Sequence, residues 1–146
     1  MTPWIGTYEE GVRGGGSPED LELALQLTRL FFTEPRKDPE AFASLQSMMR
    51  TWLANRDADP MNAFRDTVRV RSSGGDPRDK PITVDVIDEV ELDPSLEFYR
   101  EVFRDCDDLV FHFVGNVDPA ALEPLARTWL GNLPASSRED AWVDRS

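Results

Sequence analysis

Five dipeptides along this chain join a residue that can cap a helix to a proline. A serine or aspartate before a helix accepts a hydrogen bond from a first-turn amide, and proline at the first helical position already has the required backbone angle. The five pairs are Ser17-Pro18, Asp38-Pro39, Asp59-Pro60, Asp93-Pro94 and Asp118-Pro119. Each pair predicts the start of a helix, and Asp20 is placed to add a capping contact after Ser17.

Apolar residues three and four positions apart follow each of these starts, as in amphipathic helices. We predict helices over 18–32, 39–55, 60–71, 94–104 and 119–130, and a short helical turn over 84–90. The 18–32 helix is apolar over most of its circumference, so we expect it to pack on more than one side. The 39–55 helix carries a single stripe, which predicts one buried face: Phe42, Leu45, Met49, Trp52 and Leu53.

Strands are scarce in the sequence. The apolar run from Leu109 to Val114 predicts a buried strand that leads through Gly115-Asn116 into the last helix, and only 4–13 also looks extended. Two strands do not form an independently stable sheet. The missing strands therefore come from another part of a longer polypeptide, or two copies pair their edges. We expect an α+β fold in which helices pack on a small, incomplete antiparallel sheet.

The length of 146 residues suits one domain or a large piece of one. We expect a single partial domain over 1–146, and its predicted parts are a strand and glycine turn (1–16), a helical segment (17–71), a loop (72–82), a helix-strand-helix unit (83–134) and a tail (135–146).

Charge narrows the range of partners. The chain has 28 acidic and 16 basic residues and a net charge of -12, which repels phosphate backbones and anionic lipids. We therefore expect neither nucleic acid nor membrane partners. No apolar run is long enough to span a bilayer, and the first residues lack the basic start of a secretion signal, so we expect a soluble chain.

His112 is the single histidine of the chain. One imidazole cannot build a histidine-rich metal site, and the centre of a strand is a poor place for a base that must reach a substrate. In a strand, the side chain of His112 points away from those of Phe111 and Phe113. We expect a partly buried structural histidine.

Cys106 is the single cysteine, so the chain has no internal disulfide framework. Its neighbours Asp105, Asp107 and Asp108 should raise the pKa of the thiol and weaken it as a nucleophile. We expect a buried or incidental thiol.

Three further groups of residues resemble binding sites but favour simpler interpretations. The acidic cluster comprises Asp85, Asp88, Glu89, Glu91 and Asp93. It lacks the spacing of an EF-hand, and Val86, Ile87, Val90 and Leu92 interleave as expected core contacts, so it indicates a solvated face with a helix cap. The run Gly14–Gly16 lacks the residues of a phosphate loop and predicts a flexible turn. Met48, Met49 and Trp52 are expected in the core. We therefore predict no catalytic, cofactor-binding or metal-binding residue.

A series of short blocks resembles a known family when taken in order. The blocks are Tyr8–Gly14, Ser17–Glu22, Leu25–Leu27, Phe31–Asp38, Glu40–Phe42, Leu53–Arg56, Phe111–Asp118 and Leu130–Pro134. They resemble the pitrilysin (insulin-degrading-enzyme-like) zinc peptidases, in particular the carboxy-terminal, non-zinc half of the bacterial periplasmic members. The resemblance extends from about Tyr8 to Trp142.

The resemblance implies a set of related α+β domains, like those of mitochondrial processing peptidase, in two halves that close around a peptide. In that family the first half holds zinc through an inverted His-x-x-Glu-His helix and a glutamate on a later helix. This chain lacks the motif, and the matching helix has no acidic residue from Ala41 to Arg56. A loop that often reads Asn-His-Pro-Arg in the family is here Gly75-Asp76-Pro77-Arg78.

The resemblance thus implies a non-catalytic domain that walls the peptide chamber of a zinc metalloendopeptidase. Zinc would be held by the parent enzyme, the partners would be its zinc-bearing half and peptide substrates, and the location would be periplasmic or extracytoplasmic. Two alternatives stay open: a catalytically inactive family member that serves as a scaffold or protein-interaction module, and an unrelated acidic helical binding domain without a central sheet. A homo-oligomer formed through exposed strand edges is also open.

Overall fold

The computed structural model describes residues 1–6 and 9–136. It divides into two compact units, which we call unit 1 (Met1–Arg36 and Leu96–Ser146) and unit 2 (Lys37–Ser95). Residues 137–146 of the predicted tail (135–146), including Trp142, lie outside the described residues. Tyr8 also lies outside them. The single partial domain expected over 1–146 stays a prediction.

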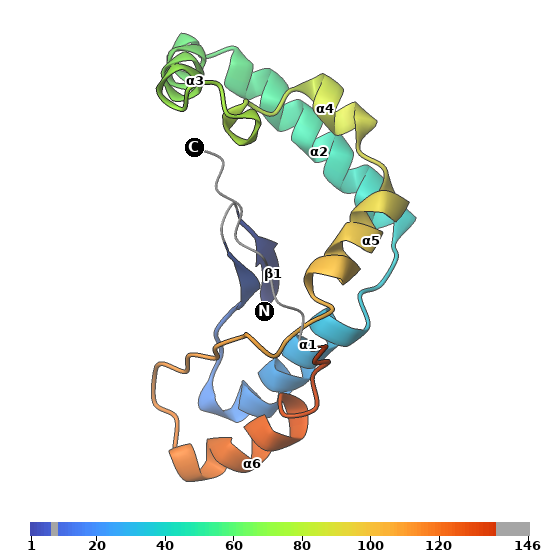
Figure 1. Cartoon of the computed structure of the whole chain (residues 1–146), viewed down its shortest axis with the longest axis vertical. Coiled ribbons are helices and arrows are strands. Elements are labelled where there is room, and N and C mark those ends of the chain that lie inside the picture. The colour runs from blue at the N-terminus through green and yellow to red at the C-terminus, as the bar shows by residue number, and fades with distance from the viewer. Residues whose placement is uncertain (7–8, 137–146) are drawn as a thin grey trace. The chain divides into compact units, whose positions relative to one another are not determined.

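Helices make up most of unit 2 and are the longest regular elements of unit 1 (Figure 1). Unit 1 contains the 3-10 turn η1 (Pro18–Asp20), α1 (Leu21–Thr33) and α6 (Pro119–Trp129). Unit 2 contains α2 (Pro39–Asp57), α3 (Pro60–Ser72), the 3-10 turn η2 (Pro77–Asp79) and α4 (Val84–Glu89). Helix α5 (Leu92–Val102) begins in unit 2 and continues in unit 1. Every predicted helix is present.

The capping residues explain most of these starts. The carboxylates of Asp38, Asp59 and Asp118 accept hydrogen bonds from first-turn amides of α2, α3 and α6. Two starts differ from the prediction. Ser17 makes no side-chain cap, and its hydroxyl instead donates to the Asp20 carboxylate at 2.8 Å. Helix α5 begins at Leu92, ahead of the predicted cap at Asp93, because the Ser95 amide and hydroxyl already donate to the carbonyl of residue 91.

The sheet of the described residues is one antiparallel hairpin. Strands β1 (Thr2–Ile5) and β2 (Glu10–Arg13) pair so that Thr2 lies opposite Arg13. The stretch predicted as extended, 4–13, therefore contains parts of two strands. Gly14 follows β2 and lies beside Met1, where an added Cβ would clash with the Met1 side chain and backbone. The fold is α+β, with helices and a small antiparallel sheet.

The prediction of a strand over 109–114 is wrong. This segment has an irregular conformation, and Val110 and Val114 are 74% and 97% exposed. A strand requires a partner for its backbone hydrogen bonds. Among the described residues β2 pairs with β1 alone, so nothing extends the sheet to this segment. The apolar run is typical of a strand buried in a sheet, but it carries no information on whether a neighbouring strand is present to pair with it.

The core of unit 1 lies where α1 meets the end of α5. Phe32, Phe103 and Cys106 are buried together, and the Phe32 and Phe103 rings meet edge to face at 5.2 Å. The Tyr99 hydroxyl donates to the Phe31 carbonyl at 2.9 Å. This cluster fixes α1 to α5 through both apolar contacts and a satisfied polar group.

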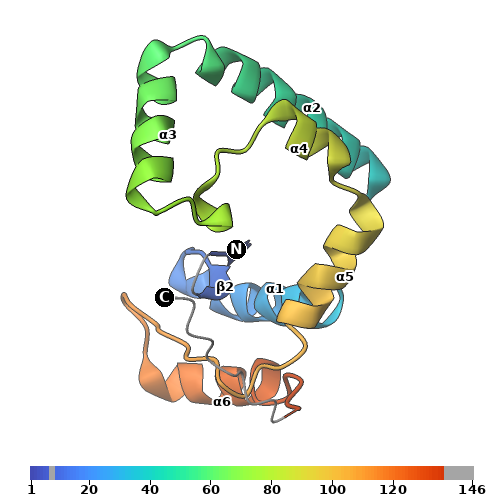
Figure 2. The same ribbon diagram turned by 45° about the horizontal axis from the view of Figure 1, so that its top comes forward.

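Helix α1 also packs on α6, and Figure 2 shows the two helices side by side. The Trp129 indole donates to the Glu22 carboxylate at 3.3 Å, and the Arg29 guanidinium donates to the Asn132 carbonyl at 3.2 Å. Helix α1 thus packs against both α5 and α6, in agreement with the prediction of more than one packed side, but part of its apolar circumference is uncovered. One stripe is buried (Leu25, Thr28 and Phe32), whereas Leu23, Leu27 and Leu30 are exposed.

Unit 2 is held mainly by polar contacts. The Gln46 amide donates to the carbonyls of Ile87 and Val90 at 3.0 and 2.9 Å, which fixes the end of α4 against α2. The Nη2 group of Arg56 donates to both carboxylate oxygens of Asp66, at 2.7 and 2.6 Å, and so joins α2 to α3. Leu53 alone is buried among the described residues of this unit.

The predicted buried stripe of α2 is therefore only partly formed. Leu53 is 1% exposed, but Trp52 is 53% exposed, and Leu45 and Met48 are also exposed. Met48 and Trp52 were predicted in the core, and that prediction is wrong. Helix α2 contacts α3 and α4, yet Leu53 is its one buried residue among those the structure describes.

Candidate functional site

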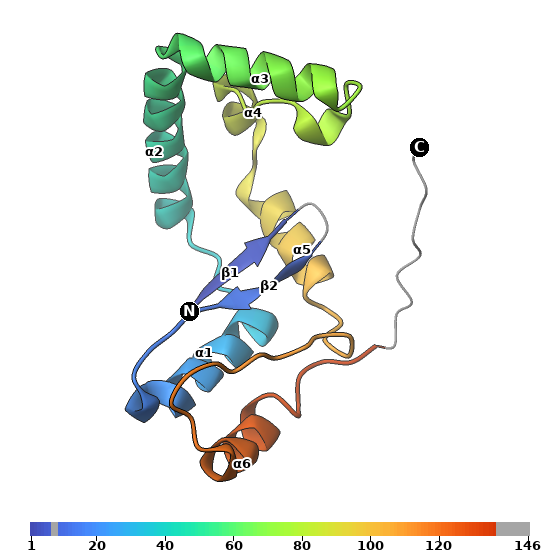
Figure 3. The same cartoon turned by 90° about the vertical axis from the view of Figure 1, so that its left-hand side faces the viewer.

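A groove of about 1110 Å³ lies within unit 1. It is lined by β2, by the glycine run 14–16, by one face of α1 and by the segment 108–117, and we call it the β2 groove. In Figure 3 the hairpin lies above α1, and the segment that leads to α6 crosses in front of this helix. The volume is slightly above the usual range of small-molecule pockets, so the groove has room for several residues of a peptide.

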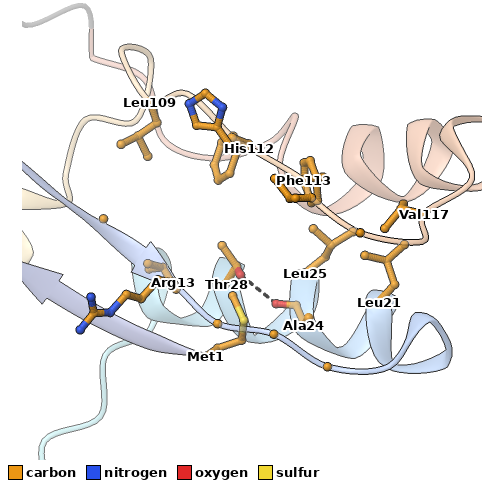
Figure 4. Close-up of a pocket in the computed structure, with 18 of the residues that line it drawn as sticks. Met1, Arg13, Leu21, Ala24, Leu25, Thr28, Leu109, His112, Phe113 and Val117 are labelled. Atoms are coloured by element: carbon orange, nitrogen blue, oxygen red, sulfur yellow. Dashed lines mark hydrogen bonds between the residues drawn. The ribbon is translucent and has the colours of Figure 1, made fainter.

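About half of the residues that line the β2 groove have apolar side chains. Figure 4 shows Leu21 and Leu25 of α1 on the side facing Phe113 and Val117 of the opposite segment. The buried hydroxyl of Thr28 donates to the Ala24 carbonyl at 2.8 Å, so it is not available to a ligand. Side chains of this kind provide apolar contact area and no reactive group.

Carboxylates predominate among the charged residues of the groove. Among the residues that the structure describes, Glu9, Glu10, Asp20 and Asp108 line it, and Arg13 is the one lysine or arginine of the lining. A positively charged ligand is therefore favoured, and phosphate or carboxylate ligands are disfavoured.

His112 lies on the rim of this groove and is exposed. In Figure 4 its ring extends from the side of the segment away from α1. The prediction of a partly buried structural histidine is wrong, because the strand that was expected to bury it does not form. Among residues 1–6 and 9–136, no three histidine, cysteine or acidic side chains come together in a way that could hold a metal ion.

Cys106 lies in the core beside Phe103, and its amide donates to the Pro134 carbonyl at 2.9 Å. Burial, followed by the charges of Asp105, Asp108 and Asp107, raises the pKa of the thiol to about 11. The prediction of a buried thiol with a raised pKa is confirmed. At neutral pH the group is protonated and is a weak nucleophile.

The acidic cluster of unit 2 forms ion pairs at the surface. Asp88 accepts from Arg50 at 2.5 Å, and Asp93 pairs with Lys37. All five acidic residues of the cluster are exposed, in agreement with a solvated face. The expectation that its apolar neighbours are core contacts is wrong for Val86 and Val90, which are exposed, whereas Ile87 and Leu92 are half-buried.

The sequence did not predict the β2 groove. The signals were present, because Gly14–Gly16 and the apolar run 109–114 both line it, but each was interpreted alone. Only the packing of α1 brings the two segments to opposite sides of one groove.

The chain matches no family model, no curated protein and no solved structure. The resemblance to the pitrilysin-like peptidases therefore stays a prediction. Over the part of the chain that the structure describes, none of the helices combines the length and the apolar character needed to cross a membrane.

Proposed function

We propose that this chain is a non-catalytic domain of a pitrilysin-like zinc metalloendopeptidase and forms part of the wall of its peptide chamber. The zinc and the catalytic glutamate would belong to the other half of the enzyme, in a periplasmic or extracytoplasmic location. This proposal rests first on the ordered sequence blocks from Tyr8 to Pro134.

The structural observation that supports the proposal is the large amount of exposed apolar surface in both units. Apolar side chains that would normally be covered are open on α1, α2 and α3 and along 110–114: among them are Leu30, Trp52, Phe64 and Val114. Contiguous apolar surface on a folded chain marks contact with another polypeptide. A domain that works inside a larger enzyme needs such surfaces, whereas an independent catalyst does not.

The acidic groove of unit 1 is compatible with a chamber that takes cationic or neutral peptides. Within the described part of the chain, four carboxylates line it against one arginine. Long-range attraction of a positively charged peptide would concentrate the substrate at this wall.

The first test is a measurement of metal content and activity on the purified chain. We expect no stoichiometric zinc by elemental analysis after incubation with the ion and dialysis, and no cleavage of quenched fluorescent peptides. The single histidine is the reason, because this zinc chemistry needs at least two imidazoles on one ion. Tight one-to-one zinc binding together with peptidase activity would overturn the proposal.

The second test separates the proposal from its main alternative, an inactive family member that acts as a scaffold or interaction module. The gene that encodes this chain should be sequenced through its upstream region and its neighbours. A His-x-x-Glu-His motif in the same or the adjacent reading frame supports the peptidase domain. A related upstream half without those histidines supports the scaffold.

A further inference from the structure

The two sides of the β2 groove are backbone segments without sheet partners. Strand β2 is hydrogen-bonded to β1 on one side only, so the outward amides and carbonyls of Glu10–Arg13 are unpaired within the described residues. Across the groove, residues 109–114 make no backbone hydrogen bond to any part of the chain that the structure describes. Such groups bind water unless another backbone replaces it.

The side chains around these segments favour an extended apolar ligand. Leu21 and Leu25 form the α1 side of the groove, and Phe111 and Phe113 are more than one-third exposed on the other side. The glycine run contributes backbone without side chains, and an added Cβ on Gly15 would meet nothing within 4 Å. An incoming chain can therefore approach the end of β2 closely.

Charge determines which extended chain fits. The groove carries Glu9, Glu10, Asp20 and Asp108 against Arg13, so lysine or arginine beside the apolar centre of a ligand is favoured. A second copy of this chain is disfavoured, because each copy has a net charge of -12 and the two repel each other.

We propose that the β2 groove binds an extended segment of a different polypeptide, with an apolar centre and basic flanks, which adds as a strand between β2 and residues 109–114. The bound backbone would pair with Glu10–Arg13 on one side and order 109–114 as a strand on the other. Backbone pairing provides affinity and the apolar and acidic lining provides selectivity, as in other cases of strand addition. This inference uses only unit 1 and does not depend on the zinc-peptidase proposal.

The test uses the full chain and a synthetic peptide, Lys-Lys-Val-Thr-Val-Thr-Val-Thr-Lys-Lys. We expect the peptide to bind in fluorescence anisotropy and to slow amide hydrogen exchange in two segments together, 10–13 and 109–114. A version with N-methylated alternate amides keeps the charge and most of the apolar surface but lacks strand donors. It should bind at least about tenfold more weakly, and a version with glutamate in place of lysine should also bind more weakly.

Two proline variants test whether the backbone amides of 109–114 pair with the peptide. Successive amides of an extended segment point in opposite directions, so one of the Val110 and Phe111 amides faces the added strand. Val110→Pro or Phe111→Pro, but not both, should weaken peptide binding about tenfold. Val110→Ala and Phe111→Ala lose the same side chains but keep the amide, so each proline variant is compared with the alanine variant at its own position. Circular dichroism verifies that each variant keeps its helices.

Three results would overturn the proposal: equal binding of the N-methylated peptide, exchange protection elsewhere than the two segments, or full binding by both proline variants. A fourth result would assign the groove to a second copy. In that case, 10–13 and 109–114 would become protected without peptide as concentration rises, and sedimentation would show a dimer.

Discussion

Units 1 and 2 have similar helices but are stabilised in different ways. Unit 1 buries an aromatic cluster around Phe103, whereas the single buried side chain in the described residues of unit 2 is Leu53. Unit 2 relies instead on capped helix ends, the Gln46 amide and the Arg56–Asp66 ion pair. Apolar burial contributes more free energy per residue than exposed polar contacts do. We therefore expect unit 2 to open more readily than unit 1.

The largest effect is expected from Phe103→Ala, which removes the centre of the unit 1 core. Phe103 is 2% exposed, and the cavity should lower the free energy of unfolding by about 3 to 5 kcal/mol. Urea denaturation followed by hydrogen exchange in α1 and α6 measures this loss. The matched control is Phe98→Ala in α5, the helix that ends just before Phe103; the Phe98 ring is 59% exposed and the expected change is below about 1 kcal/mol. Equal effects of the two substitutions would contradict this account of the core.

The next effect is expected from Leu53→Ala in unit 2. This change should cost about 2 to 4 kcal/mol and should accelerate hydrogen exchange in α2 and α3. Leu45→Ala on the same helix is the control, because Leu45 is exposed and should cost far less. If exchange in unit 1 accelerates as much as in unit 2, the two units unfold together and the comparison between them fails.

Unit 1 should lose stability at alkaline pH through Cys106. The folded thiol has a pKa of about 11 against an ordinary value of 9.0, so the thiol stays protonated longer in the folded state. The contribution of the protonated thiol to stability is fully present below pH 9 and is lost as the pH rises towards 11. The free energy of unfolding should fall by up to about 2 kcal/mol over this range. Urea midpoints across this range test the sign. Cys106→Ala should be less sensitive to alkaline pH than the parent chain, and an unchanged dependence would contradict the assignment.

Unit 2 should show the opposite pH dependence through Asp66, with the smallest effect. The hydrogen bonds and charge of Arg56 hold the pKa of Asp66 below its ordinary value of 3.8. The contribution of the pair is therefore complete above that pH and is lost as the pH falls through the lowered pKa. Hydrogen exchange in α3 should accelerate on acidification in the parent chain.

Asp66→Asn tests this assignment, because it removes the ionisable group at the same size. The variant should show faster exchange in α3 at neutral pH and a flatter acid dependence. Asp85→Asn, at an exposed site on α4, should resemble the parent chain. An unchanged acid profile in Asp66→Asn would show that the ion pair does not hold α3 to α2.

Helices could be predicted because their signals are local. A capping aspartate and a proline act on the first turn that follows them, so Asp38, Asp59 and Asp118 mark starts that the structure confirms. The Schellman-type end of α3 is equally local, with the Gly75 amide donating to the Val70 carbonyl at 3.1 Å and Gly74 at a positive φ of 66°.

Burial could not be predicted to the same degree, because it depends on residues far away in the sequence. Leu25 and Leu23 belong to one apolar helix, yet only Leu25 faces a neighbour. Trp52 and Leu53 are adjacent, and only Leu53 is covered. The candidate site depends on the same distant packing, since α1 sets the segment 108–117 against β2.

The sequence by itself determined the helices of this protein, its strong negative charge and the single imidazole that limits its chemistry. These properties follow from side chains acting over a few residues, or from a simple count of them. Only the tertiary structure decided that 109–114 is not a strand, that much apolar surface is open and that an acidic groove lies beside β2. A strand and a groove each need two backbone segments brought together, and for 109–114 the segment on the other side of the groove is far away in the sequence.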